Sequence, residues 1–279
     1  MKQCPDIPTL DGAEFSGHVW VQELPTGVEF RFQVAASGLV TFATARQSYD
    51  TAAAVPPQYR LAADLVNEKL DRAALETATD DPSDVTFCGI ATRNEGLEFD
   101  WQRVPAFVGI DVWSGRQDKF LSPDSATGVY EHLGLPTLPA IDKELVAAHA
   151  NFDRYTDESG FPQSAWRDGH AVGVLIRDKS NRRAAAWSDE PRSQTGPVAR
   201  SAETLAAQYA TDERIARTVA EMGADSQSTA VDVVRDRLVS AVAREAYAEL
   251  FSDEEFASDL SAFRSAVAER VQQFQPTAE

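Results

Sequence analysis

Apolar and polar residues alternate strictly between residues 17 and 42, as in the run VEFRFQV at 28–34. A repeat of two residues places every second side chain on one face, so this region predicts antiparallel strands. Proline and glycine meet the dihedral demands of tight reversals. We therefore expect turns between these strands at Leu24-Pro25-Thr26-Gly27 and at Ala36-Ser37-Gly38.

The pattern then changes to a helical repeat, with leucines on one face of residues 59–77, and strands resume beyond it. Ser122-Pro123 supplies a capping hydroxyl and a first-turn proline for a short helix. Further strands are predicted at 84–91, 96–101, 107–113, 170–177 and 183–187.

After residue 200 the apolar period becomes 3.6 residues, and it predicts three amphipathic helices. They cover 201–222, 229–251 and 252–274, and the capping box Ser252…Glu255 is expected to open the last one. The predicted class is thus α+β, with mixed, mainly antiparallel sheets and flanking helices followed by an all-helical part. We expect a first domain at 1–190, a linker at 191–200 and a helical domain at 201–279.

The composition is strongly acidic, with 44 acidic against 26 basic residues and a formal charge of −18. This balance resembles proteins of salt-loving archaea, and it opposes non-specific binding to phosphate backbones without excluding a local RNA site. The sequence has neither an apolar run of membrane-spanning length nor a secretory leader, so a cytoplasmic protein without a membrane partner is expected.

Two cysteines are too few for a disulfide framework, and neither has a zinc-binding spacing. We expect Cys4 to be free and Cys88 to pack as a small buried residue. No metal site is predicted.

Several short segments resemble, in their order, the motifs of the RNA ligase family of the covalent nucleotidyltransferase superfamily. They are VWVQELPTGVEFRFQV (19–34), SGLVTFATARQ (37–47), TFCGIATR (86–93), DWQRVPAFVGIDVW (100–113) and GHAVGVLIRDKSNRRAAAW (169–187). The resemblance covers roughly residues 15–275, and it implies a nucleotidyltransferase fold with a helical C-terminal domain.

Ligases of this family form a covalent lysyl-AMP from ATP with magnesium or manganese, which requires a lysine nucleophile, carboxylates and a second lysine. In this chain the corresponding positions lack those charges. Leucine occupies the nucleophile position, and the other replaced motif positions are also uncharged: Leu24, Thr26, Ile90, Val172 and Ala185. No lysine occurs between Lys2 and Lys69, so a shifted alignment does not restore the nucleophile.

Some candidate contacts persist. The resemblance implies that Arg46 contacts phosphate and that Phe107 stacks on a base, while an exposed arginine and a core phenylalanine are the alternatives. Residues 177–200 carry six basic and three acidic side chains. Four of the basic residues gather around one predicted turn: Arg177, Lys179, Arg182 and Arg183. They are candidate contacts for RNA or phosphate, and the alternative is that they balance the charge of the acidic helices.

Three hypotheses follow. The first is a degenerate, haloarchaeal-type RNA-ligase-like pseudoenzyme that binds RNA, nucleotide or a partner such as an active ligase. The second is an active ATP-dependent RNA ligase that uses a lysine outside the family motifs, and only this hypothesis requires ATP and Mg²⁺ or Mn²⁺ as cofactors. The third is a structural or assembly protein, which a central cleft filled by apolar side chains would favour.

Overall fold

The computed structural model describes every residue except 157, 191, 193–195, 198, 225–226 and 275–279. It divides into two compact units. Unit 1 comprises Met1–Val55, Ala62–Thr92 and Leu97–Pro191, and unit 2 comprises Pro56–Leu61, Arg93–Gly96 and Arg192–Glu279. The domain boundaries expected from the sequence stay a prediction, because five residues of the expected linker lie outside the described residues.

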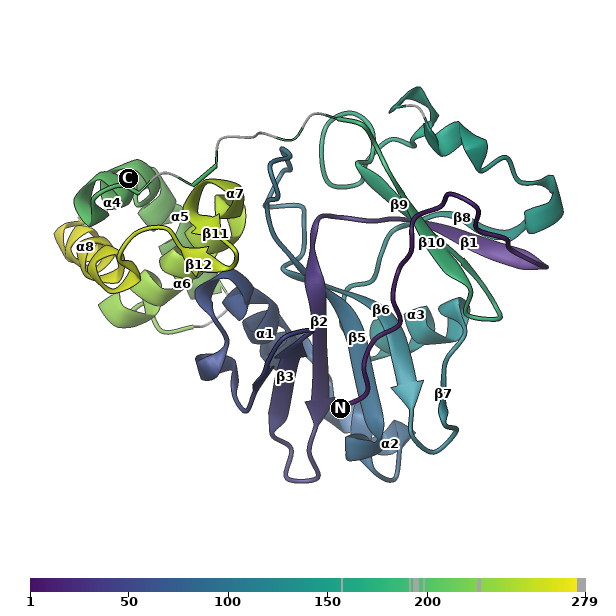
Figure 1. Cartoon of the computed structure of the whole chain (residues 1–279). Coiled ribbons are helices and arrows are strands. Elements are labelled where there is room, and N and C mark those ends of the chain that lie inside the picture. The colour runs from purple at the N-terminus through teal and green to yellow at the C-terminus, as the bar shows by residue number, and fades with distance from the viewer. Residues whose placement is uncertain (157, 191, 193–195, 198, 225–226, 275–279) are drawn as a thin grey trace. The chain divides into compact units, whose positions relative to one another are not determined.

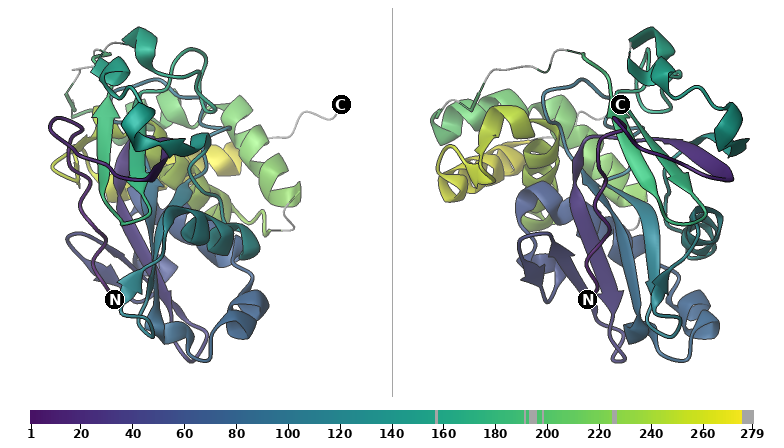
Figure 2. Two further views of the ribbon diagram at one scale, coloured as in Figure 1. Left: turned by 90° about the vertical axis from the view of Figure 1, so that its right-hand side faces the viewer. Right: turned by 45° about the vertical axis from the view of Figure 1, so that its right-hand side comes forward.

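Two antiparallel sheets build unit 1 (Figures 1 and 2). The four-stranded sheet, sheet A, has the order β10-β9-β1-β8, from β1 (His18–Glu23), β8 (Ala140–Val146), β9 (Gly173–Asp178) and β10 (Arg183–Trp187). The six-stranded sheet, sheet B, has the order β4-β3-β2-β5-β6-β7. Its strands are β2 (Gly27–Val34), β3 (Val40–Thr44), β4 (Ser48–Tyr49), β5 (Val85–Thr92), β6 (Phe107–Ser114) and β7 (Lys119–Phe120).

Alternation along sheet B separates an aromatic core from a second face. Phe30 and Phe32 of β2 pack with Phe87 of β5 and Phe107 of β6, and Tyr130 from a helix completes this cluster. The intervening positions on the same strands, among them Glu29 and Ile90, point to the other face, where they line a cavity.

Three helices accompany sheet B in the sequence: α1 (Pro57–Lys69), α2 (Arg72–Ala78) and α3 (Pro123–His132). Helix α3 packs on β6, and its Tyr130 hydroxyl donates to the carbonyl oxygens of Cys88 (2.8 Å) and Asp111 (3.0 Å). Short 3₁₀ helices lie at Ala52–Ala54, Pro82–Asp84, Ala147–His149, Asp153–Thr156 and Glu158–Gly160.

The predicted α+β class with antiparallel sheets is confirmed, but three local predictions are wrong. β1 and β2 do not form a hairpin, because they belong to different sheets and residues 24–26 connect the two. Residues 96–101 are not a strand. The single helix expected at 59–77 is two helices, since the Asp71 side chain accepts from the Ala74 amide and caps a new one.

Unit 2 is largely helical, as predicted, but its described residues form more and shorter elements than the three helices expected. They are α4 (Ala202–Tyr209), α5 (Asp212–Ala224), α6 (Val231–Glu245), α7 (Tyr247–Leu250), the small hairpin β11 (Phe251–Ser252) and β12 (Glu255–Phe256), and α8 (Leu260–Gln273). The expected capping box is wrong, because Ser252 and Glu255 pair in the hairpin and Asp259 caps α8.

No helix within the described residues combines the length and the apolar character needed to cross a membrane.

Candidate functional site

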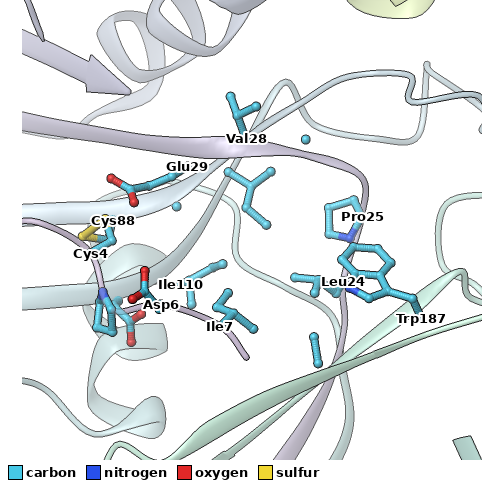
Figure 3. Close-up of a pocket in the computed structure, with 16 residues that line it drawn as sticks. Cys4, Asp6, Ile7, Leu24, Pro25, Val28, Glu29, Cys88, Ile110 and Trp187 are labelled. Carbon is cyan, nitrogen blue, oxygen red and sulfur yellow. A yellow bond between two sulfur atoms is a disulfide. The ribbon is translucent and has the colours of Figure 1, made fainter. Parts of the chain in front are cut away.

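A cavity in unit 1 brings together three positions at which the family resemblance implies charged residues. Leu24, labelled in Figure 3, follows β1, Ile90 lies on β5 and Ala185 lies on β10. All three line a cavity of about 250 Å³. Ligand pockets usually measure roughly 300–1,000 Å³, so the space is small for a nucleotide. Three residues that are distant in the sequence, and that belong to different motif segments, thus line the same cavity.

The same three residues belong to one apolar cluster. Leu24 and Ala185 are buried, and Ile90 is half-buried beside them. The other members of the cluster are also apolar, chiefly Val104, Val108, Ile110, Leu138, Trp166 and Leu175. The side chain at position 24 therefore packs among apolar side chains, where burying the charge of a lysine would be costly.

The charged groups that line the cavity are carboxylates. Asp6 and Glu29, both labelled in Figure 3, contribute them together with Asp111, and the sixteen lining residues include no lysine or arginine. Burial raises the pKa of Glu29, with the nearby Asp6 acting in the same direction and Arg31, 3.1 Å away, opposing it. Glu29 and Asp111 are already paired with arginines, and the lining offers no lysine or arginine of its own, so the residues present do not fit the polyphosphate of ATP.

The five lysines lie elsewhere in the described structure. Lys2 stacks on the Trp113 ring, Lys143 lies over the Trp20 ring and Lys179 pairs with Glu144, while Lys69 ends α1 and Lys119 starts β7. None lines the cavity. Among the described residues, no group of three or more histidine, cysteine, aspartate or glutamate side chains gathers as a metal site requires.

Two of the basic residues predicted to contact RNA or phosphate are buried in an ion-pair network. The Arg177 guanidinium donates to Asp111 Oδ1 (3.1 Å), to the Ile110 carbonyl (2.7 Å) and to Gln22 Oε1 (2.6 and 3.0 Å). Arg183 pairs with the other oxygen of Asp111. Burial lowers the pKa of Arg177, and the Asp111 carboxylate opposes that shift. The network ties β9 and β10 of sheet A to β6 of sheet B.

The other two basic residues remain accessible at the turn between β9 and β10. Lys179 pairs with Glu144 at 2.9 Å and Arg182 with Asp178 at 2.8 Å, and about half of each basic side chain is exposed. A phosphate at this turn would compete with those acidic partners. The four candidates therefore share one hairpin, but only two of them reach solvent.

The two candidate nucleotide contacts lie away from the cavity. Arg46 is exposed between β3 and β4. Phe107 is fully buried, and its ring packs against Phe30, Phe32 and Tyr130, which leaves no free face for a base. Its geometry matches the alternative interpretation, a core residue.

The other two positions compared with the family motifs, Thr26 and Val172, are buried without lining the cavity. The glycines beside Ile90 and Val172 have a packing role. A Cβ at Gly89 would come within 2.2 Å of the Val108 oxygen, and one at Gly173 within 2.7 Å of the Trp187 ring. Their presence is thus explained without a ligand.

The segment Cys4–Leu10 is the main feature that the sequence did not reveal. It passes along the cavity, where Cys4 forms a disulfide with Cys88 (Cα–Cα 5.8 Å), so the expectation of a free Cys4 is wrong (Figures 1 and 3). Ile7 of this segment and Trp187 of β10 also line the cavity. The signal that could have found the segment is Pro5 and Pro8, which favour an extended backbone around an apolar residue.

No model of a known protein family matches the sequence, and no curated protein matches it. Among solved structures, it is similar to an archaeal ATP-dependent RNA ligase, form 1, with a TM-score of 0.49 and 16% identity over 98% of this chain and 66% of that one. Form 2 gives a TM-score of 0.49 and 17% identity over 88% and 63%. An RNA ligase from Naegleria gruberi, an E312A mutant with AMP and Mn, gives 0.48 and 11% over 67% and 56%. The chain spans less than two thirds of the lengths of these ligases, and similarity at this level does not extend to activity, substrates or partners.

Proposed function

We propose that the chain is an RNA-ligase-like protein that does not form lysyl-AMP and that acts by binding another macromolecule. The observation that most supports the absence of lysyl-AMP formation is the convergence of Leu24, Ile90 and Ala185 on one small apolar cavity, which also favours the structural or assembly alternative. The resemblance placed three charged roles at these residues, and hydrocarbon occupies all three.

Adenylation needs an amine that attacks the α-phosphate, together with positive charge or metal to stabilise the developing negative charge. The cavity presents carboxylates in place of cations, and Ile7 fills part of it. ATP and Mg²⁺ or Mn²⁺ therefore form no part of the proposal. An active ligase with another lysine gains no support, since each of the five lysines lies away from the cavity.

The macromolecule that the chain binds is RNA or another protein. RNA would meet the exposed Lys179 and Arg182, and an active ligase or another protein is the partner alternative. The acidic composition supports placing the protein in the cytoplasm of a salt-loving archaeon within the same proposal.

Incubation with α-labelled ATP and magnesium or manganese, followed by denaturing electrophoresis, tests the proposal. The natural chain and a Leu24→Lys variant are compared with an active ATP-dependent RNA ligase as the positive control. We expect label only on the control ligase. Label on the natural chain refutes the loss of adenylation, and label on the variant alone shows that the cavity still admits ATP.

A further inference from the structure

The segment Cys4–Leu10 pairs with the edge of sheet A through one β-bridge. Thr9 pairs in parallel with Ala185 of β10, the edge strand of the sheet. The Ala185 amide donates to the Pro8 carbonyl, and the Leu10 amide donates to the Ala185 carbonyl, both at 2.8 Å. Ala185 thus holds the segment through both of its main-chain hydrogen-bonding groups.

Two apolar side chains of the segment enter separate apolar clusters of unit 1. Ile7 packs against the cluster of Leu24 and Leu175, while Leu10 packs against a second cluster that includes Val174 and Ile176. A second hollow, of about 690 Å³, borders Thr9 and Leu10, and Ala185 and Trp187 line both hollows. The edge of β10 therefore provides main-chain pairing and two side-chain sites.

Three side chains of the segment lie at the surface. Asp6, Pro8 and Thr9 are exposed, and the Asp6 carboxylate lies close enough to the half-buried Glu29 to disfavour ionisation there. The covalent link is the Cys4–Cys88 disulfide, which contains both cysteines of the chain. Because Cys88 lines the same cavity as Ala185, the bond keeps the segment near β10 when its other contacts open.

We propose that the edge of β10 is a groove for an extended peptide of another chain, and that the Cys4–Cys88 disulfide keeps it closed with the chain's own segment. The peptide carries aliphatic side chains three residues apart, like Ile7 and Leu10. Strand addition at a sheet edge is a common mode of peptide recognition, in which main-chain bonds supply affinity and pockets supply specificity. This inference goes beyond the proposed loss of adenylation and does not use it.

Opening the groove requires a dithiol reductant. Its two thiols form a disulfide as the Cys4–Cys88 bond breaks, and each protein sulfur gains one electron and one proton. The released segment remains attached to the chain, so it competes with any added peptide at a high effective concentration. The test therefore uses a variant in which the chain's own segment binds the groove less tightly.

The test uses the full chain with Ile7→Asp, oxidised or reduced, and a fluorescent peptide of residues 2–11 in which Cys4→Ser prevents a mixed disulfide. Anisotropy is expected to show binding to the reduced chain about tenfold or more tighter than to the oxidised chain. A peptide with Ile7→Asp should lose this binding. The matched peptide with Thr9→Asp, changed at an exposed side chain, should keep it.

Hydrogen exchange on the natural chain gives an independent measurement that needs no variant. Reduction should raise the exchange rates of the Leu10 and Ala185 amides by about tenfold or more, because both depend on the paired segment. Equal peptide binding in both redox states overturns the proposal. So does continued protection of these amides after reduction, or exchange without peptide binding. Since ATP labelling is read separately, failure here is distinguishable from failure of the proposed function.

Discussion

Replacing Asp111 by asparagine should destabilise unit 1 strongly. Its carboxylate pairs with both Arg177 and Arg183, and each of the three side chains is at most 4% exposed. Asp111→Asn raises the net charge of this buried group from +1 to +2 in the low-dielectric region between the sheets. Removing one partner of a buried ion pair lowers the free energy of unfolding by about 3–5 kcal/mol. Loss of the carboxylate from a doubly paired site should lie in that range.

Guanidinium unfolding followed by circular dichroism measures this loss. The matched control is Asp168→Asn, because Asp168 forms a solvent-exposed pair with Arg103 at 3.7 Å, and such pairs contribute little. A variant that replaces Asp111, Arg177 and Arg183 together with apolar residues should recover most of the lost stability, since no charge then remains buried. If Asp111→Asn unfolds like the control, the network is not the structural tie described.

Three further changes test the packing around the cavity. Leu24→Ala should lower the free energy of unfolding by about 2–5 kcal/mol, as measured by denaturant titration, because a buried leucine leaves a cavity. Gly89→Ala should destabilise by about 1–3 kcal/mol through overpacking, whereas Gly128→Ala, in α3 with open space around it, should stabilise by about 0.5–1 kcal/mol; thermal melts showing equal effects would contradict this. Burial raises the pKa of Glu29, so the folded state binds its proton more tightly and stability falls as pH rises through that raised pKa. The stability of Glu29→Gln relative to the natural chain should therefore be greater at about pH 7 than at about pH 4, and denaturant titrations showing no such difference would refute the assignment.

Local patterns predicted the strands but not their partners. Alternation at residues 28–34 correctly indicates β2, which pairs with β3 across the turn at Ala35–Leu39. The same alternation cannot indicate that β1 joins β8 and β9 in the other sheet. Pairing between distant strands depends on tertiary packing, which a period of two residues does not encode.

The helical region shows a similar limit. The 3.6-residue period identified residues 201–274 as largely helical. The period alone does not show where one helix ends and the next begins. Asp253 and Glu254 adopt positive φ angles of 48° and 71°, and they turn the chain between β11 and β12. The capping-box spacing therefore occurs by coincidence in a hairpin, and the true cap is Asp259.

At the candidate site, the motif resemblance identified Leu24, Ile90 and Ala185, which the structure brings to one cavity. It missed Ile7, Trp187 and the disulfide. A bond between cysteines separated by 84 residues has no local signature, and two cysteines alone predict no framework. The basic hairpin was visible as charge, but only tertiary structure shows that Arg177 and Arg183 pair inward.

The intact mass of the natural chain after incubation with ATP and manganese tests the central claim most directly. The chain is denatured before measurement, so only covalent AMP is retained. We predict the mass of the unmodified chain, because hydrocarbon surrounds position 24 and no lysine lines the cavity. A species heavier by one AMP, mapped by peptide fragmentation to any of the five lysines, would contradict the account.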